Sequence, residues 1–320
     1  MPMSIFSQDF STLWNKYAQA ERDDLPKTQI EVLDKIIDKA NKENAYGHLL
    51  KAELCRMEAV TAITPDSIDA EIAKLEKKEQ KSAKKQVLAA VYQSVLGNIY
   101  KYKLDPEKDV ATISKDYFAK SLSNPTLLAS TKAGDFVPLM KEGKDSKYYN
   151  NDLLSVLCAQ ADDYQTLHEY YVKNGNREAA CLSACQMVRN TDADELYGQS
   201  QAAIKRAIQK VDSLLAVYGD LEVAGELALL KYDIIEHDID VKNEEKIQFI
   251  NDAKKNWAKW PRIQSLENKK NQLIQPRYSM DFGPKVVLPN TPRTIEFGMI
   301  RNLSSISATV TRVEIDPLKS

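Results

Sequence analysis

The sequence predicts a mainly α-helical protein, in which an irregular array of helical hairpins is followed by a short antiparallel β segment. Apolar residues recur at helical spacing as far as Leu273, and beyond Pro276 they alternate with polar residues in short stretches. Glycine is scarce, with 10 residues in 320, which disfavours an all-β chain. We therefore expect residues 1–275 to form the helical array and residues 276–320 to form the β segment.

The first half of the array is expected to begin with an aromatic helix and to continue with several amphipathic helices. Three residues mark the boundaries between them: Pro26 suits a first helical turn, Asn44 can cap the third helix, and Pro65 starts another. The apolar positions at helical spacing are Phe6, Phe10, Leu13, Trp14, Tyr17, Ile30, Leu33, Ile37, Leu49, Leu50, Leu54, Leu88, Val91, Val95, Ile99, Tyr102, Phe118 and Leu122.

Residues 123–150 are the least regular part of the array, because they combine glycine, proline and a Tyr-Tyr-Asn-Asn cluster at their end. This segment is a candidate joint between two helical halves. The helices expected in the second half are 151–161, 163–173, 176–190, 195–218, 221–237, 243–258 and 262–274. Short connections favour stacked antiparallel hairpins that are loosely similar to tetratricopeptide (TPR) repeats, although no strict period of about 34 residues can be aligned.

The C-terminal segment is expected to form three short strands. Residues 284–292 are bracketed by proline, which favours an edge strand. Residues 293–301 alternate cleanly, and a turn at Asn302 leads to a last strand that contains a bulge. The alternating apolar residues are Ile295, Phe297, Met299, Ile306, Ala308 and Val310. Three strands leave open edges and an uncovered face, so we expect the chain to be the N-terminal piece of a larger protein, cut inside an immunoglobulin-like sandwich.

Composition argues against several classes of protein. The net charge is −2, so no global attraction to nucleic acid is expected. No apolar run reaches the roughly 18 residues of a membrane helix, and the first ten residues do not resemble a signal peptide. Four cysteines have neither zinc-site nor CxxC spacing. Cys181 and Cys185 lie four residues apart on a predicted helix, and we expect buried small side chains there in preference to a metal or redox pair.

No motif predicts catalysis or a bound cofactor. The chain has no P-loop, no nucleophile elbow and no dinucleotide fingerprint. His168-Glu169 lacks the second histidine of a zinc-protease helix, and His48 is expected to be structural. His237 stands in an acidic run at a helix end, where a cap or an exposed turn is expected and a cation site is the alternative. We therefore predict a non-enzymatic protein without a cofactor or a metal.

Two groups of residues are candidates for a partner surface. The first is a basic stripe, which lies within about 120° of one helical face if the helix through residues 72–87 is continuous. The second is a set of tyrosines that would line a groove in a helical array. The stripe consists of Lys74, Lys77, Lys78, Lys81, Lys84 and Lys85, and the tyrosines are Tyr148, Tyr149, Tyr164, Tyr170 and Tyr171. An acidic partner could bind the stripe, although a solvated helix face is the simpler interpretation.

Four segments near the N-terminus carry a resemblance to a known family. They read LWNKY at 13–17, DLPKT at 24–28, EVLDKI at 31–36 and LLKAEL at 49–54. Together they resemble the N-terminal helical region of bacterial α2-macroglobulin proteins, especially those of Bacteroidetes. The segments VLP at 287–289, IEF at 295–297 and RNL at 301–303 are similar to the entry into the first macroglobulin-type (MG2) sandwich of that family.

The resemblance implies a secreted or cell-envelope protein that traps or inhibits endopeptidases without turning over a substrate. Thioester-bearing members carry a Gly-Cys-Gly-Glu-Gln motif and a bait segment, and neither is found here. The chain would then be an accessory helical module whose partners are downstream macroglobulin domains and proteases. The alternative is a TPR-like scaffold that binds peptides or proteins in a cell-surface assembly. A hidden enzyme would require a pocket with convergent titratable groups.

Overall fold

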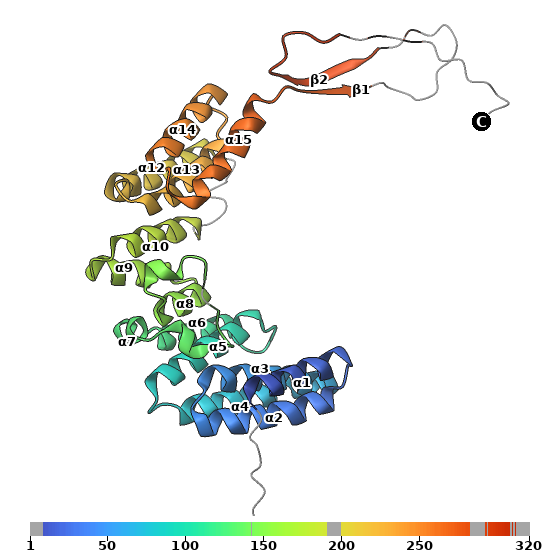
Figure 1. Ribbon diagram of the computed structural model, residues 1–320, viewed down its shortest axis with the longest axis vertical. Helices are drawn as coiled ribbons and strands as arrows, with labels where there is room; N and C mark the ends of the chain where they lie inside the picture. Colours follow the sequence, from blue (N-terminus) through green and yellow to red (C-terminus); the bar gives the residue numbers. More distant parts are fainter. Residues whose placement is uncertain are drawn as a thin grey trace, which may run out of the picture. The chain divides into compact units, whose positions relative to one another are not determined.

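A computed structural model of the protein describes residues 9–141, 143–190, 200–281, 292, 294–307, 309 and 311. Within these residues the protein is mainly helical and contains one two-stranded antiparallel sheet (Figure 1). The predicted class, mainly α with a short antiparallel β segment, is therefore confirmed. The chain divides into two compact units, Met1–Leu196 with Ala216–Tyr218, and Tyr197–Leu215 with Gly219–Ser320.

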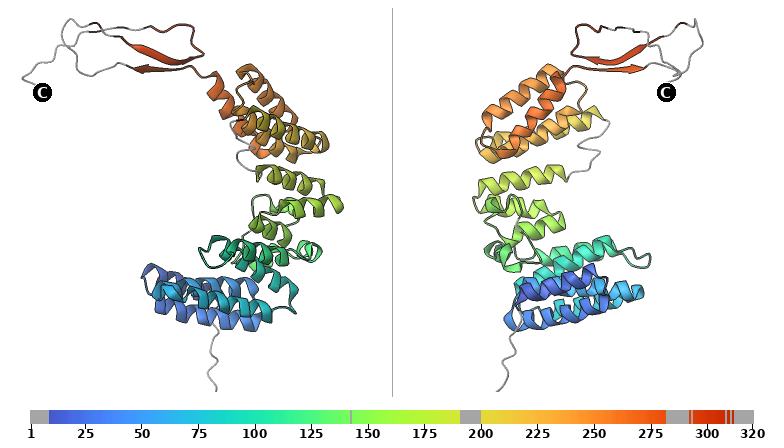
Figure 2. Two further views of the ribbon diagram at one scale, coloured as in Figure 1. Left: turned by 180° about the vertical axis from the view of Figure 1, so that it is seen from behind. Right: turned by 45° about the vertical axis from the view of Figure 1, so that its right-hand side comes forward.

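The first unit is built from helices that are neighbours in the chain. They are α1 (Phe10–Arg22), α2 (Pro26–Glu43), α3 (Tyr46–Ile63), α4 (Ile68–Lys81), α5 (Gln86–Tyr102), α6 (Val110–Ser121), α7 (Pro125–Ser130), α8 (Leu153–Ala161), α9 (Tyr164–Lys173) and α10 (Arg177–Arg189), with 3-10 turns η1 (Pro65–Ser67), η2 (Ala133–Phe136) and η3 (Ser146–Tyr149). Figure 2 shows α1, α2 and α3 lying side by side. Residues 123–150, the candidate joint, lie inside this unit.

Polar residues set where these helices begin and end. Asp163 and Asn176 accept hydrogen bonds from backbone amides in the first turns of α9 and α10, which are N-cap contacts. Asn44 and Asp162 have φ values of 53° and 55°, so they end α2 and α8 in the left-handed conformation that asparagine and aspartate tolerate. The boundary between α2 and α3 lies at Asn44, but the prediction that Asn44 caps the start of the third helix is wrong, because it caps the end of α2 and Ala45 is the N-cap residue of α3.

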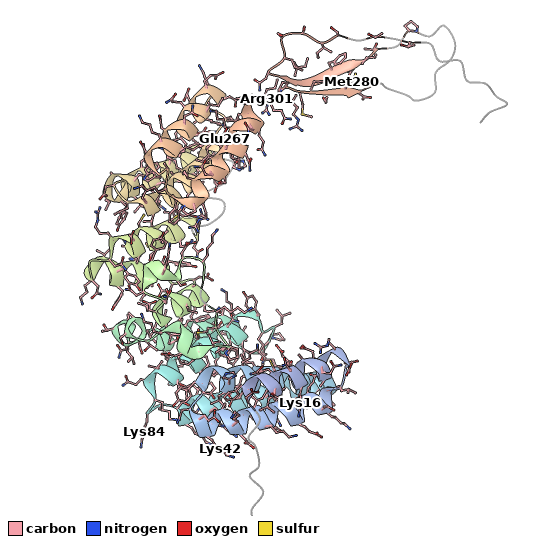
Figure 3. All side chains as sticks on the ribbon, in the orientation of Figure 1. Lys16, Lys42, Lys84, Glu267, Met280 and Arg301 are labelled. Carbon is pink, nitrogen blue, oxygen red and sulfur yellow. The ribbon has the colours of Figure 1, made fainter. Side chains whose placement is uncertain are left out.

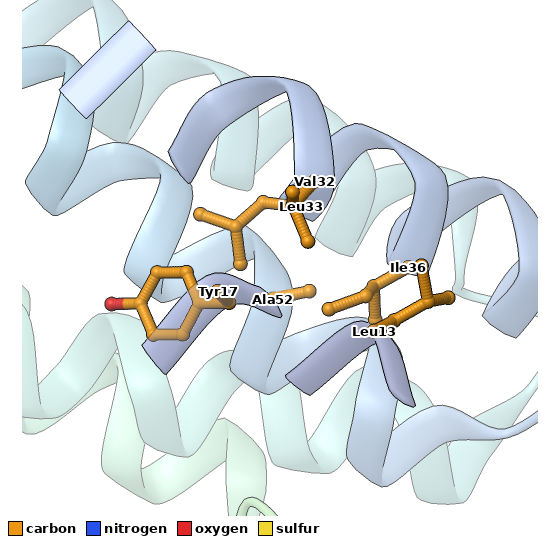
Figure 4. Packing of buried hydrophobic residues seen from close by; sticks show 6 residues of the cluster. All are labelled: Leu13, Tyr17, Val32, Leu33, Ile36 and Ala52. Carbon is orange, nitrogen blue, oxygen red and sulfur yellow. The ribbon is translucent and has the colours of Figure 1, made fainter. Parts of the chain in front are cut away.

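The core of α1, α2 and α3 is apolar and closely packed (Figure 4). It consists of Leu13, Tyr17, Val32, Leu33, Ile36 and Ala52. Phe10 and Trp14 pack against its edge together with His48, whose ring stacks on Phe10 with centroids 3.8 Å apart. The indole Nε1 of Trp14 donates a hydrogen bond of 2.9 Å to Nδ1 of His48. His48 is therefore part of the packing, as the sequence predicts.

The second unit contains four helices within its described residues. They are α12 (Gln201–Tyr218, whose last three residues belong to the first unit), α13 (Gly225–Glu236), α14 (Asn243–Asn256) and α15 (Ser265–Ile274), with 3-10 turns η4 (Glu222–Ala224) and η5 (Pro261–Gln264). Trp260 is buried, and its indole Nε1 donates to the carboxylate of Glu226 at 3.1 Å. Gly225 leaves the space for this ring, because a Cβ there would collide with the indole.

The sheet of the second unit is a hairpin of β1 (Arg277–Asp281) and β2 (Glu296–Arg301). The prediction of clean alternation over residues 293–301 is wrong, because the register shifts between Arg277 and Ser279 and Met299 has a φ of 49°. An extra residue in β2 moves the side chains after it to the other face. Most of the further strands predicted near 284–292 and 306–315 lies outside the described residues.

Candidate functional site

The basic stripe is not one continuous helical face. Lys74, Lys77, Lys78 and Lys81 lie on α4, but α4 ends at Lys81 and α5 begins at Gln86. The hydroxyl of Ser82 bonds back to the Lys78 carbonyl at 2.8 Å, which satisfies an acceptor of the last turn and competes with continuation of the helix. Lys84 and Lys85 therefore belong to the intervening turn, and the prediction of a single stripe is wrong.

The six lysines also differ in what they contact. Lys78 pairs with Glu53 and Lys74 pairs with Glu71, whereas the ammonium group of Lys85 lies 5.1 Å from the centre of the Tyr46 ring. Lys77, Lys81 and Lys84 are exposed and form no ion pair within the described residues, and Figure 3 shows Lys84 extending away from the helices. Only Lys74 and Lys78 are thus part of a structured site.

These two lysines line a cleft of about 350 Å³ between α2, α3 and α4, which we call the charged cleft. Its charged members are Asp34, Glu53, Arg56, Glu71, Lys74 and Lys78. Two of the carboxylates are withdrawn from water, since Glu53 is 5% exposed and Glu71 is 6% exposed. Acidic side chains are seldom buried to this extent unless they are paired, so the cleft depends on its cations.

Glu53 is satisfied on both oxygens. Lys78 contacts Oε1 at 2.8 Å, and the buried hydroxyl of Tyr92 on α5 donates to Oε2 at 2.7 Å. Burial, with the carboxylate of Glu53 beside it, raises the pKa of Tyr92 well above its usual range, so the phenol stays protonated and remains a donor. This carboxylate therefore ties α3 to both α4 and α5.

Arg56 joins the other two carboxylates of the charged cleft. Its Nε lies 2.7 Å from Oδ1 of Asp34, and its terminal nitrogen lies 3.8 Å from Oε2 of Glu71, which also accepts from Lys74 on Oε1. The three cations and three carboxylates of the cleft thus form one chain of contacts, Asp34–Arg56–Glu71–Lys74, and a separate pair, Glu53–Lys78. A site of this kind can recognise a partner that carries both signs of charge by exchanging ion-pair partners, and its half-exposed rim groups Asp34 and Lys74 are the accessible ones.

The tyrosines do not form the predicted exposed surface. Tyr171 is 2% exposed, which corrects the expectation that it lines a groove, and most of Tyr149 is buried as well. The hydroxyl of Tyr171 donates to the carboxylate of buried Asp152, which also caps α8 through the amide of Ser155 at 2.9 Å. A buried phenol needs such a partner, and the sequence did not reveal Asp152 as one. Tyr148 and Tyr170 are half-buried at the edge of this cluster.

A second hollow, of about 370 Å³, lies beside the tyrosine cluster between η3, α8, α9 and α10. Tyr149 and Tyr164 line it together with Leu167 and Leu182, so part of its wall is apolar and aromatic. We call it the tyrosine hollow. Concave surfaces with an apolar wall and a few polar groups are typical of small-ligand or peptide contacts. Of the predicted tyrosines, the structure brings Tyr149 and Tyr164 to one recess.

We predict that Lys78→Met lowers the free energy of unfolding by about 2 kcal/mol, because it leaves the buried carboxylate of Glu53 without its cation. This figure is below the usual loss for a buried pair, since the side chain of Lys78 is 40% exposed and water can replace it in part. Lys81→Met on the same helix is the matched control and is expected to change stability by less than about 0.5 kcal/mol. Urea unfolding of the three proteins measures both values, and equal stabilities would contradict the assigned role of Lys78.

The cysteines behave as predicted, since Cys181 and Cys185 are fully buried on α10. Among the described residues, no group of three or more His, Cys, Asp or Glu side chains is placed to hold a metal ion. No described helix is long and apolar enough to cross a membrane.

Comparison of the chain with protein-family models, with curated proteins and with solved structures gave no significant match.

Proposed function

We propose that this chain is a non-enzymatic helical module of an α2-macroglobulin-like protein of the cell envelope or the extracellular space, whose full-length form inhibits endopeptidases by trapping them. The proposal rests on the segments that resemble that family and on the succession of a helical region and a β hairpin. Its partners would be proteins: the macroglobulin-type domains that follow it, and proteases. One fold class can host many functions, so a specific surface of the protein must support this one as well.

The single observation that carries the proposal is the apolar surface of the hairpin. Met299 is 71% exposed and Ile300 is 55% exposed, and Tyr278 and Met280 on the facing strand are also exposed. A two-stranded ribbon with uncovered apolar side chains is marginally stable by itself, and a second sheet packed on it would bury them. This supports the proposal that β1 and β2 open an immunoglobulin-like, macroglobulin-type sandwich.

A protease assay tests the functional part of the proposal. We expect the full-length protein to slow the cleavage of a large protein substrate by an endopeptidase, and residues 1–320 alone to leave the rate unchanged. Inhibition that requires the downstream domains agrees with an accessory helical module. Full inhibition by residues 1–320, or none by the full-length protein against serine, cysteine and metallo-endopeptidases, would contradict it.

The second candidate is a TPR-like helical scaffold that binds peptides in a cell-surface assembly. The tyrosine hollow favours it, because Tyr164 and Leu167 on α9 and Leu182 on α10 form a recess between consecutive helices. Sequence-adjacent helices such as α2 with α3, and α9 with α10, pack against each other, which is what a hairpin array would require. A peptide library selected on residues 1–320 separates the two proposals: enrichment that Tyr164→Ala abolishes supports the scaffold.

A further inference from the structure

A cavity of about 560 Å³ lies in the second unit at the point where α15 ends and the hairpin begins. Four cationic side chains line it, Lys246, Lys269, Arg277 and Arg301, together with one carboxylate, that of Glu236. We call it the basic pocket. All of these residues belong to the second unit, and α13, α14, α15 and both strands contribute to the lining. Such an excess of cations in one cavity focuses a positive potential inside it.

The single carboxylate is already engaged. Glu236 contacts Nζ of Lys269 at 2.6 Å. Lys246 is 7% exposed, and its ammonium donates to the backbone carbonyls of Glu236 at 3.0 Å and of Asp238 at 3.1 Å. The first carbonyl belongs to the last residue of α13 and the second lies two residues beyond it; both accept from Lys246 but carry no formal charge. Within the described residues, no carboxylate pairs with Lys246, Arg277 or Arg301.

The two arginines face each other across the hairpin, since Arg277 and Arg301 are register partners on β1 and β2. Like charges directly opposite each other destabilise a strand pair. The guanidinium of Arg301 donates to the carbonyl of Gln272 in the last turn of α15, and Figure 3 shows Arg301 where the hairpin meets this helix. The Nε of Arg301 is buried and has no acceptor within the described residues. The side chain of Arg277 makes no such hydrogen bond to a backbone carbonyl within the described residues.

We propose that the basic pocket binds a ligand that carries a phosphate-type oxyanion. The two arginines that line this cavity offer guanidinium N–H donors that match the oxygens of a phosphate, and a bound anion offsets the repulsion between their charges. The cavity is much larger than one phosphate ion, and the amides of Asn243, Gln272 and Gln275 line it as well. A phosphorylated small molecule or a phospholipid headgroup, with hydroxyls that these amides can contact, shares this chemistry.

Titration of residues 1–320 with inorganic phosphate and with glycerol 3-phosphate tests the proposal, with binding followed by calorimetry and by amide NMR shifts. We expect saturable binding at millimolar concentration or below, with shifts at residues 269–277 and 301. Arg277→Gln is the first variant, because the side chain of Arg277 has no hydrogen-bond or ion-pair partner within the described residues and its replacement should leave the fold intact. We expect it to weaken binding about tenfold.

Arg301→Gln is the second variant and is expected to weaken binding as well. Lys255→Gln is the matched control, since Lys255 is an exposed residue of α14 that does not line the cavity. Vesicles of phosphatidylglycerol and of phosphatidylcholine distinguish a phosphorylated small molecule from a phospholipid headgroup as the ligand. If the protein binds phosphatidylglycerol vesicles alone and binds no free phosphate, the ligand is a lipid headgroup. The proposal is overturned if no phosphate-bearing probe binds, if only a dicarboxylate such as succinate binds, or if Lys255→Gln weakens binding as much as Arg277→Gln does.

Discussion

Asp152→Ala is expected to lower the free energy of unfolding of the first unit by about 3 kcal/mol. The substitution removes the acceptor of the Tyr171 hydroxyl, which is buried, and it also removes the N-cap of α8 at Ser155. A lost cap accounts for about 1 kcal/mol, and the remainder is the cost of a buried phenol with a weaker partner, the carbonyl of Tyr149 at 3.1 Å.

Asp163→Ala is the matched control for this prediction. Asp163 caps α9 through the amide and the hydroxyl of Thr166, but it contacts no buried tyrosine. We expect it to cost about 1 kcal/mol, so the two variants should differ by about 2 kcal/mol in urea unfolding. If both cost the same, the buried contact between Asp152 and Tyr171 contributes nothing beyond the cap.

Asp152 also gives the stability of the protein a distinctive pH dependence. Burial raises the pKa of this carboxyl above its ordinary value of 3.8, although hydrogen bonds from Tyr171 and Ser155 oppose the rise. A folded-state pKa above the unfolded one means that the folded protein holds the proton more tightly, so this stabilisation is lost as the pH rises through the folded pKa. The stability of the wild type relative to Asp152→Asn should therefore fall as the pH rises above about 3.8. If the stability of the wild type relative to Asp152→Asn rose with pH, burial would not be the main influence on the pKa of Asp152.

Gly47→Ala is expected to destabilise the first unit by about 3 kcal/mol, even though alanine usually strengthens a helix interior by about 1 kcal/mol. Gly47 is buried on α3, and a Cβ there would overlap the carbonyl oxygen of Val137 and the carbonyl carbon of Phe136. Both are backbone atoms, so the chain at the end of η2 must move as a whole. Backbone cannot relieve the clash as a side chain would by changing its rotamer.

Gly143→Ala provides the comparison, because a Cβ at Gly143 has no neighbour within 4 Å. Its expected effect on the free energy of unfolding is within about 0.5 kcal/mol. Gly97→Ala lies between the two, since the atoms nearest to its Cβ belong to the side chain of Phe118. Thermal unfolding should show the smallest loss of stability for Gly143→Ala, a larger loss for Gly97→Ala and the largest for Gly47→Ala. A stabilised Gly47→Ala protein would show that the η2 segment does not pack on α3.

Helical periodicity predicted most of the first helices because their apolar faces are local features of the sequence. Leu13 and Tyr17 recur at the spacing of one face of α1, and Leu33 belongs to the apolar face of α2; all three are buried in the core of α1, α2 and α3. The same logic failed between Lys81 and Gln86, where spacing alone suggests one continuous helix. There the side chain of Ser82 competes for the Lys78 carbonyl, a contact that hydrophobic spacing does not report.

The candidate site could be predicted only in part, because its members come from distant segments. Glu53 is a carboxylate on the buried face of α3, and its partners Lys78 and Tyr92 stand on α4 and α5. The signal available in the sequence was an acidic residue between Ala52 and Leu54, inside an apolar stretch. The tyrosines were expected to line a groove of the helical array, whereas Tyr171 is buried in the fold, where Asp152 accepts the hydrogen bond of its hydroxyl.

Limited proteolysis with mass mapping tests the central proposal, that the hairpin opens a macroglobulin-type sandwich. Residues 1–320 would be compared with a form lengthened by the next about 100 residues of the reading frame, the size of one sandwich domain. We expect cleavage after Leu273 in the shorter form and protection of the same region in the longer one. Equal protection of residues 276–320 in both forms, or a reading frame without further sandwich domains, would contradict the proposal and favour a self-contained helical scaffold.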